Sequence, residues 1–492
     1  MFDLDNAKYF LKQSENIELN NEKNKELSLL IQEEENKNNE NIKKYSKYPA
    51  YLQFMKNLYK MGVFVNKLEI NFVSENYRFC RATGNINRKE LLFRIPLEAI
   101  ITIDVAKRCP MGVYFTFNLK RQLSSANLDL LTTFLLNEID KGAQSKWTFY
   151  LEFLPSNYSN FPSFYETKEY EILNETQFLE SIENKKKSIK KDYDLLVKYI
   201  PGFSKYDFNS FKKFREVVGS RVFGVNIKGK RNTIIVPFAD LLNHKRPQET
   251  YWNFDDKTNS FFIEGTTNIQ EGHEVFDSYG IKTNAMFLLH YGFTDKSNKY
   301  NKFRIDLDLN KTYPFLEEKM AFLKQKSLNK SFEIELEFPN DNMKAFFSFL
   351  RIMLYNQTNF RNINNTSPIS IENEIDLFNK IKEIMSSYLS RYSTTVDDDI
   401  NYLETNKDNI DFNSYNCYII RIDEKKILNY YLNMANNILH LINSDKNDIN
   451  SIYNYLINSL RNRIIVNDKI FEDKLFEYKK YLSHLFPLLL IK

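Results

Sequence analysis

The sequence predicts an α+β fold, in which a domain of short strands carries a helical insertion and an all-α domain follows. Three observations support this prediction. Short apolar alternations occur within residues 68–96 and again within 233–276. Residues 128–142 and 165–217 show helical periodicity, and from Tyr313 onward the pattern is almost wholly helical. The 492 residues include only 12 glycines and 12 prolines, which argues against a loop-rich or all-β chain.

Residues 1–49 are predicted to form a charged N-terminal extension, because they are rich in Glu, Lys and Asn with few apolar residues at helical spacing. The short-stranded domain is then predicted over residues 50–300, with its helical insertion at about 105–220. The helical domain takes residues 301–492. This boundary follows the change from alternating to helical apolar periodicity.

The first elements of the short-stranded domain have clear local signals. Leu52–Tyr59 shows the apolar spacing of a helix, which Gly62 ends. Apolar residues alternate over Leu68–Phe72 as in a half-buried strand, and Leu91–Pro96 is typical of a second strand. Asn127 is a candidate N-cap for a helix from Leu128 to Gly142.

Strands return after the insertion. They are predicted at Thr233–Phe238 and His273–Phe276, and as a hairpin of Tyr251–Phe254 with Ser260–Ile263. Asn284 is a candidate cap for a short helix that ends at Gly292. In the last third, two apolar stripes predict core-facing helices: Phe346, Phe349, Leu350 and Met353, and Ile427, Leu428, Tyr431, Leu432, Ala435, Ile438 and Leu439.

Composition limits the classes of function. The net charge of +4 gives no reason to expect nucleic acid or a membrane surface as partner. Cys80, Cys109 and Cys417 are far apart and form no CxxC pair, so no disulfide framework and no metal site are predicted. There is no apolar run of about 20 residues and no secretory signal at Met1–Asn20. A monomeric cytoplasmic protein is predicted, with a nuclear location left open.

Two short motifs are candidates for a site. Asn243-His244 ends an apolar stretch, and a side-chain amide there can both donate to and accept from an amino-acid-like ligand. Tyr279 precedes Gly280, so its hydroxyl could lie where backbone approaches closely. Each motif alone is as well explained by a strand-end turn or a core tyrosine. No GxSxG, HExxH or glycine-rich phosphate loop is present, and the histidines lack a metal spacing.

Together these motifs resemble a family. Pro237–His244 and Glu274–Phe293, with support from Leu135–Glu138, Tyr392–Thr395 and Arg421–Leu428, are similar in order and spacing to SET-domain methyltransferases. The resemblance is to the class with a helical C-terminal domain that includes the Rubisco large-subunit lysine methyltransferase and the actin-histidine methyltransferase. It covers about residues 50–490 and implies a SET fold followed by a substrate-binding domain.

The resemblance also implies a function and the roles of single residues. The expected activity is transfer of a methyl group from S-adenosylmethionine to a side-chain nitrogen of a protein substrate, with lysine favoured and histidine left open. The implied catalytic residue is Tyr279. The implied donor-binding residues are Arg81, Arg221, Asn243, His244 and Phe293, and the implied channel residues are Tyr291 and Lys282.

One segment departs from the family. Tyr77 and Phe79 stand where the donor-binding loop usually has glycines, which allow close backbone approach to a ligand. Two alternatives therefore stay open. The chain could be a catalytically reduced SET-like protein that acts as a protein-binding or structural module, or a helical structural protein without a pocket.

Overall fold

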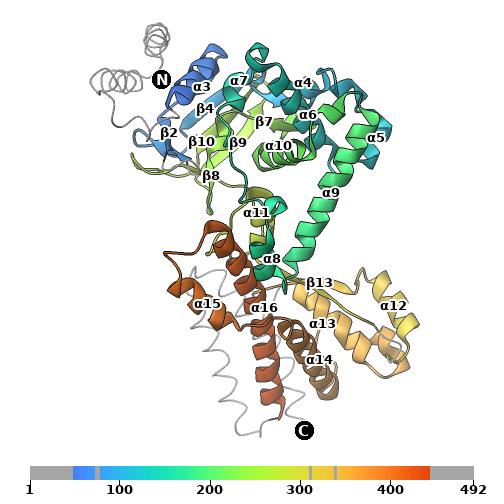
Figure 1. Cartoon of the computed structure of the whole chain (residues 1–492). Helices are drawn as coiled ribbons and strands as arrows, with labels where there is room; N and C mark the ends of the chain where they lie inside the picture. The colour runs from blue at the N-terminus through green and yellow to red at the C-terminus, as the bar shows by residue number, and fades with distance from the viewer. Residues whose placement is uncertain (1–47, 73–77, 310–312, 337–340, 444–492) are drawn as a thin grey trace. The chain divides into compact units, whose positions relative to one another are not determined.

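The computed structural model describes residues 48–72, 78–309, 313–336 and 341–443 (Figure 1). They form two compact units. The first unit comprises the chain up to Phe164 together with Glu183–Gly280, and the second comprises Tyr165–Ile182 and the chain from Ile281 onward. The predicted extension, residues 1–49, lies almost wholly outside the described residues. The domain boundaries predicted from the sequence stay predictions.

The strands of the first unit form several small sheets. The largest is antiparallel, has the order β1-β4-β10-β9, and is held by β4 and β10 at its centre. A second sheet has the order β5-β7-β6. The strands are β1 (Phe64–Val65), β4 (Leu91–Pro96), β5 (Ile101–Thr102), β6 (Val222–Ile227), β7 (Lys230–Ile235), β9 (Thr250–Asp255) and β10 (Ser260–Gly265).

Two further strand pairs in the first unit position the candidate site. β2 (Leu68–Phe72) and β3 (Arg78–Ala82) form an antiparallel pair. β8 (Asn243–His244) pairs in parallel with β11 (Phe276–Asp277), so Asn243 lies opposite Phe276 and His244 opposite Asp277. This pairing brings together the two motifs that the sequence places more than thirty residues apart.

Helices cover the strands of the first unit. In Figure 1, α4, α6 and α10 are grouped on one side of the strands, and α6 packs against both of the others. The largest buried side chains include Trp147, Phe93, Phe238 and Phe261. The helices are α3 (Tyr48–Lys60), α4 (Ile103–Lys107), α5 (Phe117–Gln122), α6 (Ala126–Asp140), α7 (Thr148–Leu151) and α10 (Phe208–Arg221), with the part of α9 (Phe178–Tyr199) from Glu183 onward.

The second unit is mostly helical, as predicted, but it also contains a two-stranded sheet. β12 (Lys302–Asp306) pairs with β13 (Ser331–Glu335), in which Phe332 and Ile334 are buried and their neighbours are more exposed. The helices are α8 (Thr167–Leu173), α11 (Asn284–Tyr291), α12 (Leu316–Gln325), α13 (Asp341–Leu354), α14 (Ile371–Leu389), α15 (Val396–Thr405) and α16 (Phe412–Asn443).

Two predicted helix caps are wrong by one or two residues. Thr283, not Asn284, is the N-cap of α11, and its hydroxyl accepts from the Met286 backbone N–H at 3.1 Å. Helix α6 begins two residues before Leu128, so Asn127 lies inside it. The Asn284 side chain is instead buried, and its Nδ2 donates a hydrogen bond to Asp423 Oδ2 at 2.7 Å within the second unit.

Candidate functional site

A strained turn leads into the Asn243-His244 pair. The apolar strand ends at Ile235, and Phe238 then takes φ +81° and ψ −49°, close to a rare γ-turn conformation. The Phe238 ring is fully buried and meets the Phe93 ring edge-on at 5.5 Å. This packing holds the strained backbone in place. The 3₁₀ turn Ala239–Leu241 follows, with Asp240 as its middle residue.

Asn243 ties three segments of the first unit together. Its Nδ2 donates to Glu274 Oε1 at 2.8 Å and to the Arg78 carbonyl at 3.2 Å. A backbone bridge between Arg81 and Glu274 connects the same two segments. The amide therefore fixes the edge of β3 beside β8, which explains why an asparagine suits this position.

Contacts to His244 and Leu242 hold Tyr279 in place. Its backbone N–H donates to His244 Nδ1 at 2.9 Å, and its hydroxyl donates to the Leu242 carbonyl at 2.8 Å. The two rings stack with centroids 5.1 Å apart. Because His244 Nδ1 accepts this hydrogen bond, a neutral His244 imidazole carries its proton on Nε2. These contacts join Asn243-His244 and Tyr279 into one constellation, and the roles expected for these residues stay predictions.

Next to this constellation lies a buried group of charged side chains and tyrosines. We call it the arginine–aspartate cluster: Arg78, Arg221, Asp240, Tyr150 and Tyr158. Arg221 Nη1 donates to Asp240 Oδ2 at 2.9 Å, and the Tyr150 hydroxyl donates to the same oxygen at 2.7 Å. Asp240 is fully buried and the Arg221 side chain is 13% exposed. Burial opposes the charged form of Arg221, but Tyr158 and Asp240 outweigh it and raise the pKa of Arg221.

Arg78 adds a second cation to the cluster. Its guanidinium lies 4.5 Å from the Phe153 ring centroid, and Nη1 donates to the Phe153 carbonyl at 2.6 Å. Burial and the neighbouring Arg221 cation lower the pKa of Arg78 to about 10. Two guanidinium groups therefore face a single carboxylate. Arg78 Nη2 and Asp240 Oδ1 are buried and have no hydrogen-bond partner among the described residues.

Arg81, which was predicted to bind the donor, makes an ion pair with the neighbouring strand. Its guanidinium pairs with Glu69, which lies opposite it on β2, and its side chain is 40% exposed. Arg78, three residues earlier on the same strand, has the position near Arg221 that the sequence suggested for Arg81. Phe79 is half-buried on β3, and Tyr77 lies outside the described residues.

The remaining predicted site residues belong to the second unit. Tyr291 and Phe293 pack with Phe287, whose ring stacks on Phe293 at 5.3 Å. The Lys282 ammonium lies 5.7 Å from the Tyr291 ring centroid, and burial lowers the pKa of Lys282. Their expected roles toward donor and substrate stay predictions.

Arg78, Asp240 and Tyr150 were missed by sequence reasoning. Asp240 lies within Pro237–His244 and Arg78 lies between Tyr77 and Phe79, but nothing in the local pattern shows that they are buried together. Among the described residues, no group of three or more His, Cys, Asp or Glu side chains is placed to hold a metal ion. None of the helices in the described part of the chain has the length and apolar character needed to span a membrane.

Asp277 supports the turn that leads to Tyr279. It is buried and accepts from Thr250 Oγ1 at 3.0 Å and Trp252 Nε1 at 3.1 Å. Burial raises the pKa of Asp277 from 3.8 to about 6. Because the folded-state pKa lies above the unfolded value, the folded protein holds the extra proton between those pH values. The stability from this group is present in full below about pH 4 and is lost as the pH rises through about 6.

Replacing Asp277 with asparagine is expected to flatten this pH dependence. The amide oxygen can accept from Trp252, and its Nδ2 can donate to Thr250 Oγ1, which itself donates to the Phe276 carbonyl at 3.1 Å. Urea unfolding at pH 4 and pH 7 measures the effect. Between these values the wild type should lose about 2 kcal/mol more stability than D277N. Equal losses in both proteins would contradict the assignment.

Comparison with known proteins adds to this geometry. The SET domain family matches residues 78–280, and its last matched residue is also the last residue of the first unit. The family described as Rubisco LSMT substrate-binding matches residues 310–428. The second match lies wholly within the second unit.

Among curated proteins, the chain is 26% identical over 388 residues to actin-histidine N-methyltransferase of Gallus gallus, covering 73% of this chain and 63% of that protein. It is 25% identical to the Homo sapiens enzyme of the same name over 387 residues, covering 73% and 64% of the two chains. The chain thus spans less than two thirds of the length of these relatives.

Solved structures share the fold. The SET domain of LSMT bound to lysine and AdoHcy superposes with a TM-score of 0.65 at 21% identity, over 79% of this chain and 91% of that chain. Rubisco LSMT bound to AdoMet gives a TM-score of 0.65 at 20% identity, over 86% and 99% of the two chains.

Proposed function

Because the chain is a SET-domain protein that also carries a Rubisco LSMT substrate-binding domain, we propose that it is a protein methyltransferase dependent on S-adenosylmethionine. The methyl acceptor is a side-chain nitrogen of a protein. The first unit binds the donor and the second unit binds the protein substrate. The names of the curated relatives and the ligands of the similar structures support this class of reaction.

The observation that carries the proposal is the charge imbalance of the arginine–aspartate cluster. Arg78 and Arg221 place two buried cations against the single carboxylate of Asp240. Buried charge is costly unless it is compensated, so the cluster favours an additional anion. The carboxylate of an amino-acid group is such an anion, and guanidinium groups bind carboxylates with charge-assisted hydrogen bonds.

The residues present fit the amino-acid part of the donor. The unpartnered Arg78 Nη2 is a hydrogen-bond donor and the unpartnered Asp240 Oδ1 is an acceptor, and a zwitterion offers the matching acceptor and donor. Asn243 and His244 are half-buried beside this cluster and would contact the same ligand. We therefore assign Arg78, in place of Arg81, together with Arg221, Asn243 and His244 to donor binding.

When bound, S-adenosylmethionine supplies an already activated methyl group. The protein mainly has to orient the acceptor nitrogen and exclude water from it. Tyr279 suits this role because its backbone, ring and hydroxyl are each fixed by a contact. Its hydroxyl donates to the Leu242 carbonyl, and a phenolic oxygen that donates can also accept a hydrogen bond, here from the acceptor's N–H. A dipole fixed in advance needs no reorganisation during the reaction.

The acceptor side chain determines how the rate depends on pH. A lysine of ordinary pKa near 10.4 must lose a proton first, at a cost of roughly 4–5 kcal/mol at pH 7, whereas a histidine near 6.5 is mostly neutral. The preference for lysine predicted from the sequence stays a prediction. The rate for a lysine acceptor should keep rising above pH 8, and that for a histidine acceptor should level off near pH 7.5.

The function can be tested by incubating the full-length protein with methyl-labelled S-adenosylmethionine and protein extract of its own organism. We expect one or a few labelled proteins, each modified at a single lysine or histidine found by mass spectrometry. The matched control is Y279F, which should leave the same bands unlabelled. Absence of label with wild-type protein that binds the donor would contradict the proposal.

A further inference from the structure

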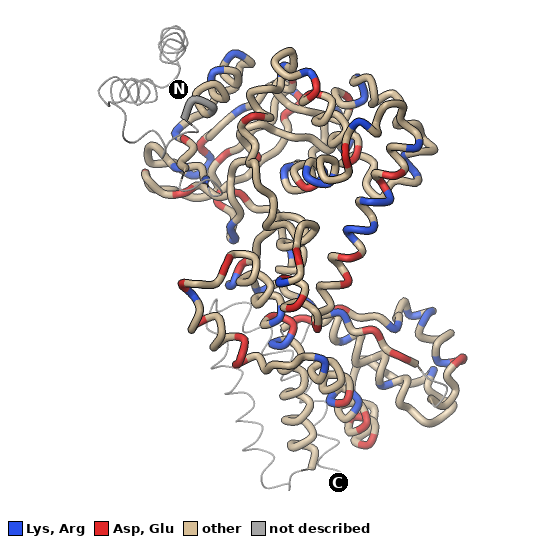
Figure 2. Tube along the Cα trace, in the orientation of Figure 1, with Lys and Arg blue, Asp and Glu red and all other residues tan. Residues whose placement is uncertain are grey.

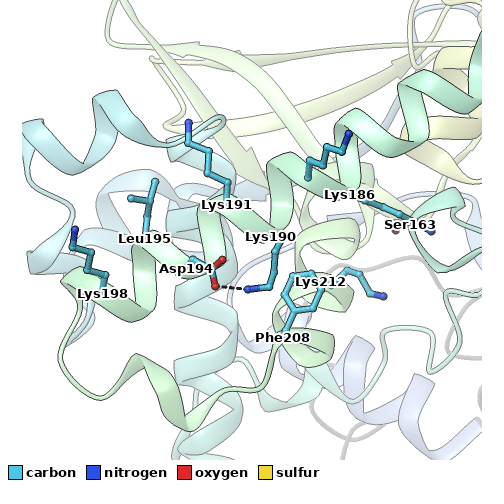
Figure 3. Close-up of a pocket in the computed structure, with 10 residues that line it drawn as sticks. Ser163, Lys186, Lys190, Lys191, Asp194, Leu195, Lys198, Phe208 and Lys212 are labelled. Carbon is cyan, nitrogen blue, oxygen red and sulfur yellow. Dashed lines mark hydrogen bonds and ion pairs between the residues drawn. The ribbon is translucent and has the colours of Figure 1, made fainter.

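A lysine-rich groove lies in the first unit, in the helical insertion. Its cavity volume is about 820 Å³, which is within the usual range for ligand-binding pockets. It runs along α9 and is closed on one side by the start of α10 (Figure 3). The lining residues are Ser163, Lys186, Lys187, Lys190, Lys191, Asp194, Leu195, Lys198, Phe208 and Lys212. We call this the lysine groove.

The groove is strongly positive. The lining contains six lysines and one acid, Asp194, whose carboxylate pairs with Lys190 at 2.5 Å. Outside the lining, Glu183 interacts with Lys186 and Glu216 with Lys212. Figure 2 shows basic positions recurring along α9, with acidic positions between some of them. Lys186 and Lys190 are four residues apart on the helix, as are Lys187 and Lys191, and like-charge pairs at this spacing destabilise a helix by about 0.2–0.5 kcal/mol each. The Lys190–Asp194 ion pair on the same face offsets part of this cost.

The floor of the groove is partly apolar. Phe208 and Leu195 are half-buried, and the Lys190 and Lys212 ammonium groups lie 5.6 and 5.8 Å from the Phe208 ring centroid. Burial lowers the pKa of Lys186 and of Lys212. A carboxylate that reaches these partly desolvated lysines gains more than it would from a fully hydrated ammonium group.

We propose that the lysine groove is a docking site for an extended acidic segment of a partner protein. From Lys186 to Lys198 the helix rises about 18 Å, which matches five or six residues of extended peptide. Carboxylates would pair with the lysine rim, and an apolar side chain of the segment would cover Leu195 and Phe208. The proposal concerns binding alone and holds whether or not methyl transfer occurs.

The lining favours a peptide over a nucleic acid. It includes no arginine, the side chain best suited to bidentate phosphate contacts. Its one aromatic ring, Phe208, has lysine ammonium groups near it from both α9 and α10, so it does not offer an open face for base stacking. The net charge of the whole chain is only +4, which gives no general attraction for polyanions.

The test uses the full-length protein and a fluorescein-labelled eight-residue peptide of glutamates with two leucines. Fluorescence anisotropy at 50 mM NaCl should show micromolar binding that weakens at least fivefold at 300 mM NaCl. The variant K190E/K191E/K198E should bind at least tenfold more weakly. The matched control K60E/K230E/K257E changes three exposed lysines of the same unit by the same charge and should bind within threefold of wild type.

Three results would overturn the proposal. One is an equal loss of binding in the groove variant and the control variant. Another is no measurable binding of the peptide by the wild type. The third is that an eight-nucleotide RNA or phosphatidylserine vesicles bind more tightly than the peptide and that the groove variant loses this binding. The groove would then be a binding site for phosphate groups. Circular dichroism of each variant confirms that it is folded.

Discussion

Replacing Tyr279 with phenylalanine is expected to lower the rate of methyl transfer about 100- to 1,000-fold, or roughly 2.7–4 kcal/mol in activation free energy. The variant loses the hydroxyl that donates to the Leu242 carbonyl at 2.8 Å, while the ring can still stack on His244. Donor affinity should therefore change by less than about threefold. The measurement is single-turnover transfer of labelled methyl to the identified substrate, combined with titration of S-adenosylhomocysteine.

A matched control separates this effect from general damage. Tyr251 is 47% exposed on β9, and Y251F removes a hydroxyl from the same unit without touching the site. Y251F should retain the wild-type rate. If Y279F also retained it, Tyr279 would not be catalytic, and the methyl transfer would have to depend on other residues.

Replacing Asp399 with alanine is expected to destabilise the second unit by about 3–5 kcal/mol. Asp399 is the shared carboxylate of Arg421 and Lys425, whose side chains are 7% and 1% exposed. Arg421 Nε donates to it at 3.1 Å and Lys425 Nζ at 2.7 Å. Removal of the carboxylate leaves both cations buried without that partner, although Glu175 still lies 3.3 Å from Arg421.

The neighbouring Asp398 provides the control. It is exposed and only caps α15 through Thr395, so D398A should cost about 1 kcal/mol. The chain has two tryptophans, Trp147 and Trp252, and both lie in the first unit. Far-ultraviolet circular dichroism during urea unfolding is therefore the measurement for the helical second unit. Equal losses in D399A and D398A would contradict the structural role of Asp399.

Much of the fold was predictable because its signals are local. The strands Leu68–Phe72 and Leu91–Pro96 were predicted with the bounds that the structure has, and the hairpin around Asp255–Asn259 was also correct. The sheet in the second unit was missed although Ser331–Glu335 alternates polar and apolar residues. The helical periodicity of the residues on both sides of Ser331–Glu335 led to the prediction of helix there, although the five residues themselves alternate as in a strand.

The candidate site was predictable only in part. Asn243, His244 and Tyr279 were found because their motifs resemble a family, and the parallel pairing of β8 with β11 brings them together. The strained turn at Phe238 was not predictable, since it depends on burial of the ring against Phe93. The position of Arg78 beside Arg221 depends equally on tertiary packing, and the sequence therefore suggested Arg81 instead.

The most direct measurement compares the affinities for S-adenosylhomocysteine and for methylthioadenosine, which lacks the amino-acid group, by isothermal titration. If the arginine–aspartate cluster binds the carboxylate, wild-type protein should prefer S-adenosylhomocysteine at least 100-fold. In R78M the preference for S-adenosylhomocysteine should fall about 10- to 150-fold, because the Arg221–Asp240 ion pair remains but one guanidinium is lost. The control R81M should keep the wild-type preference. Absence of heat with S-adenosylhomocysteine at millimolar concentration, or a preference unchanged in R78M, would contradict the account.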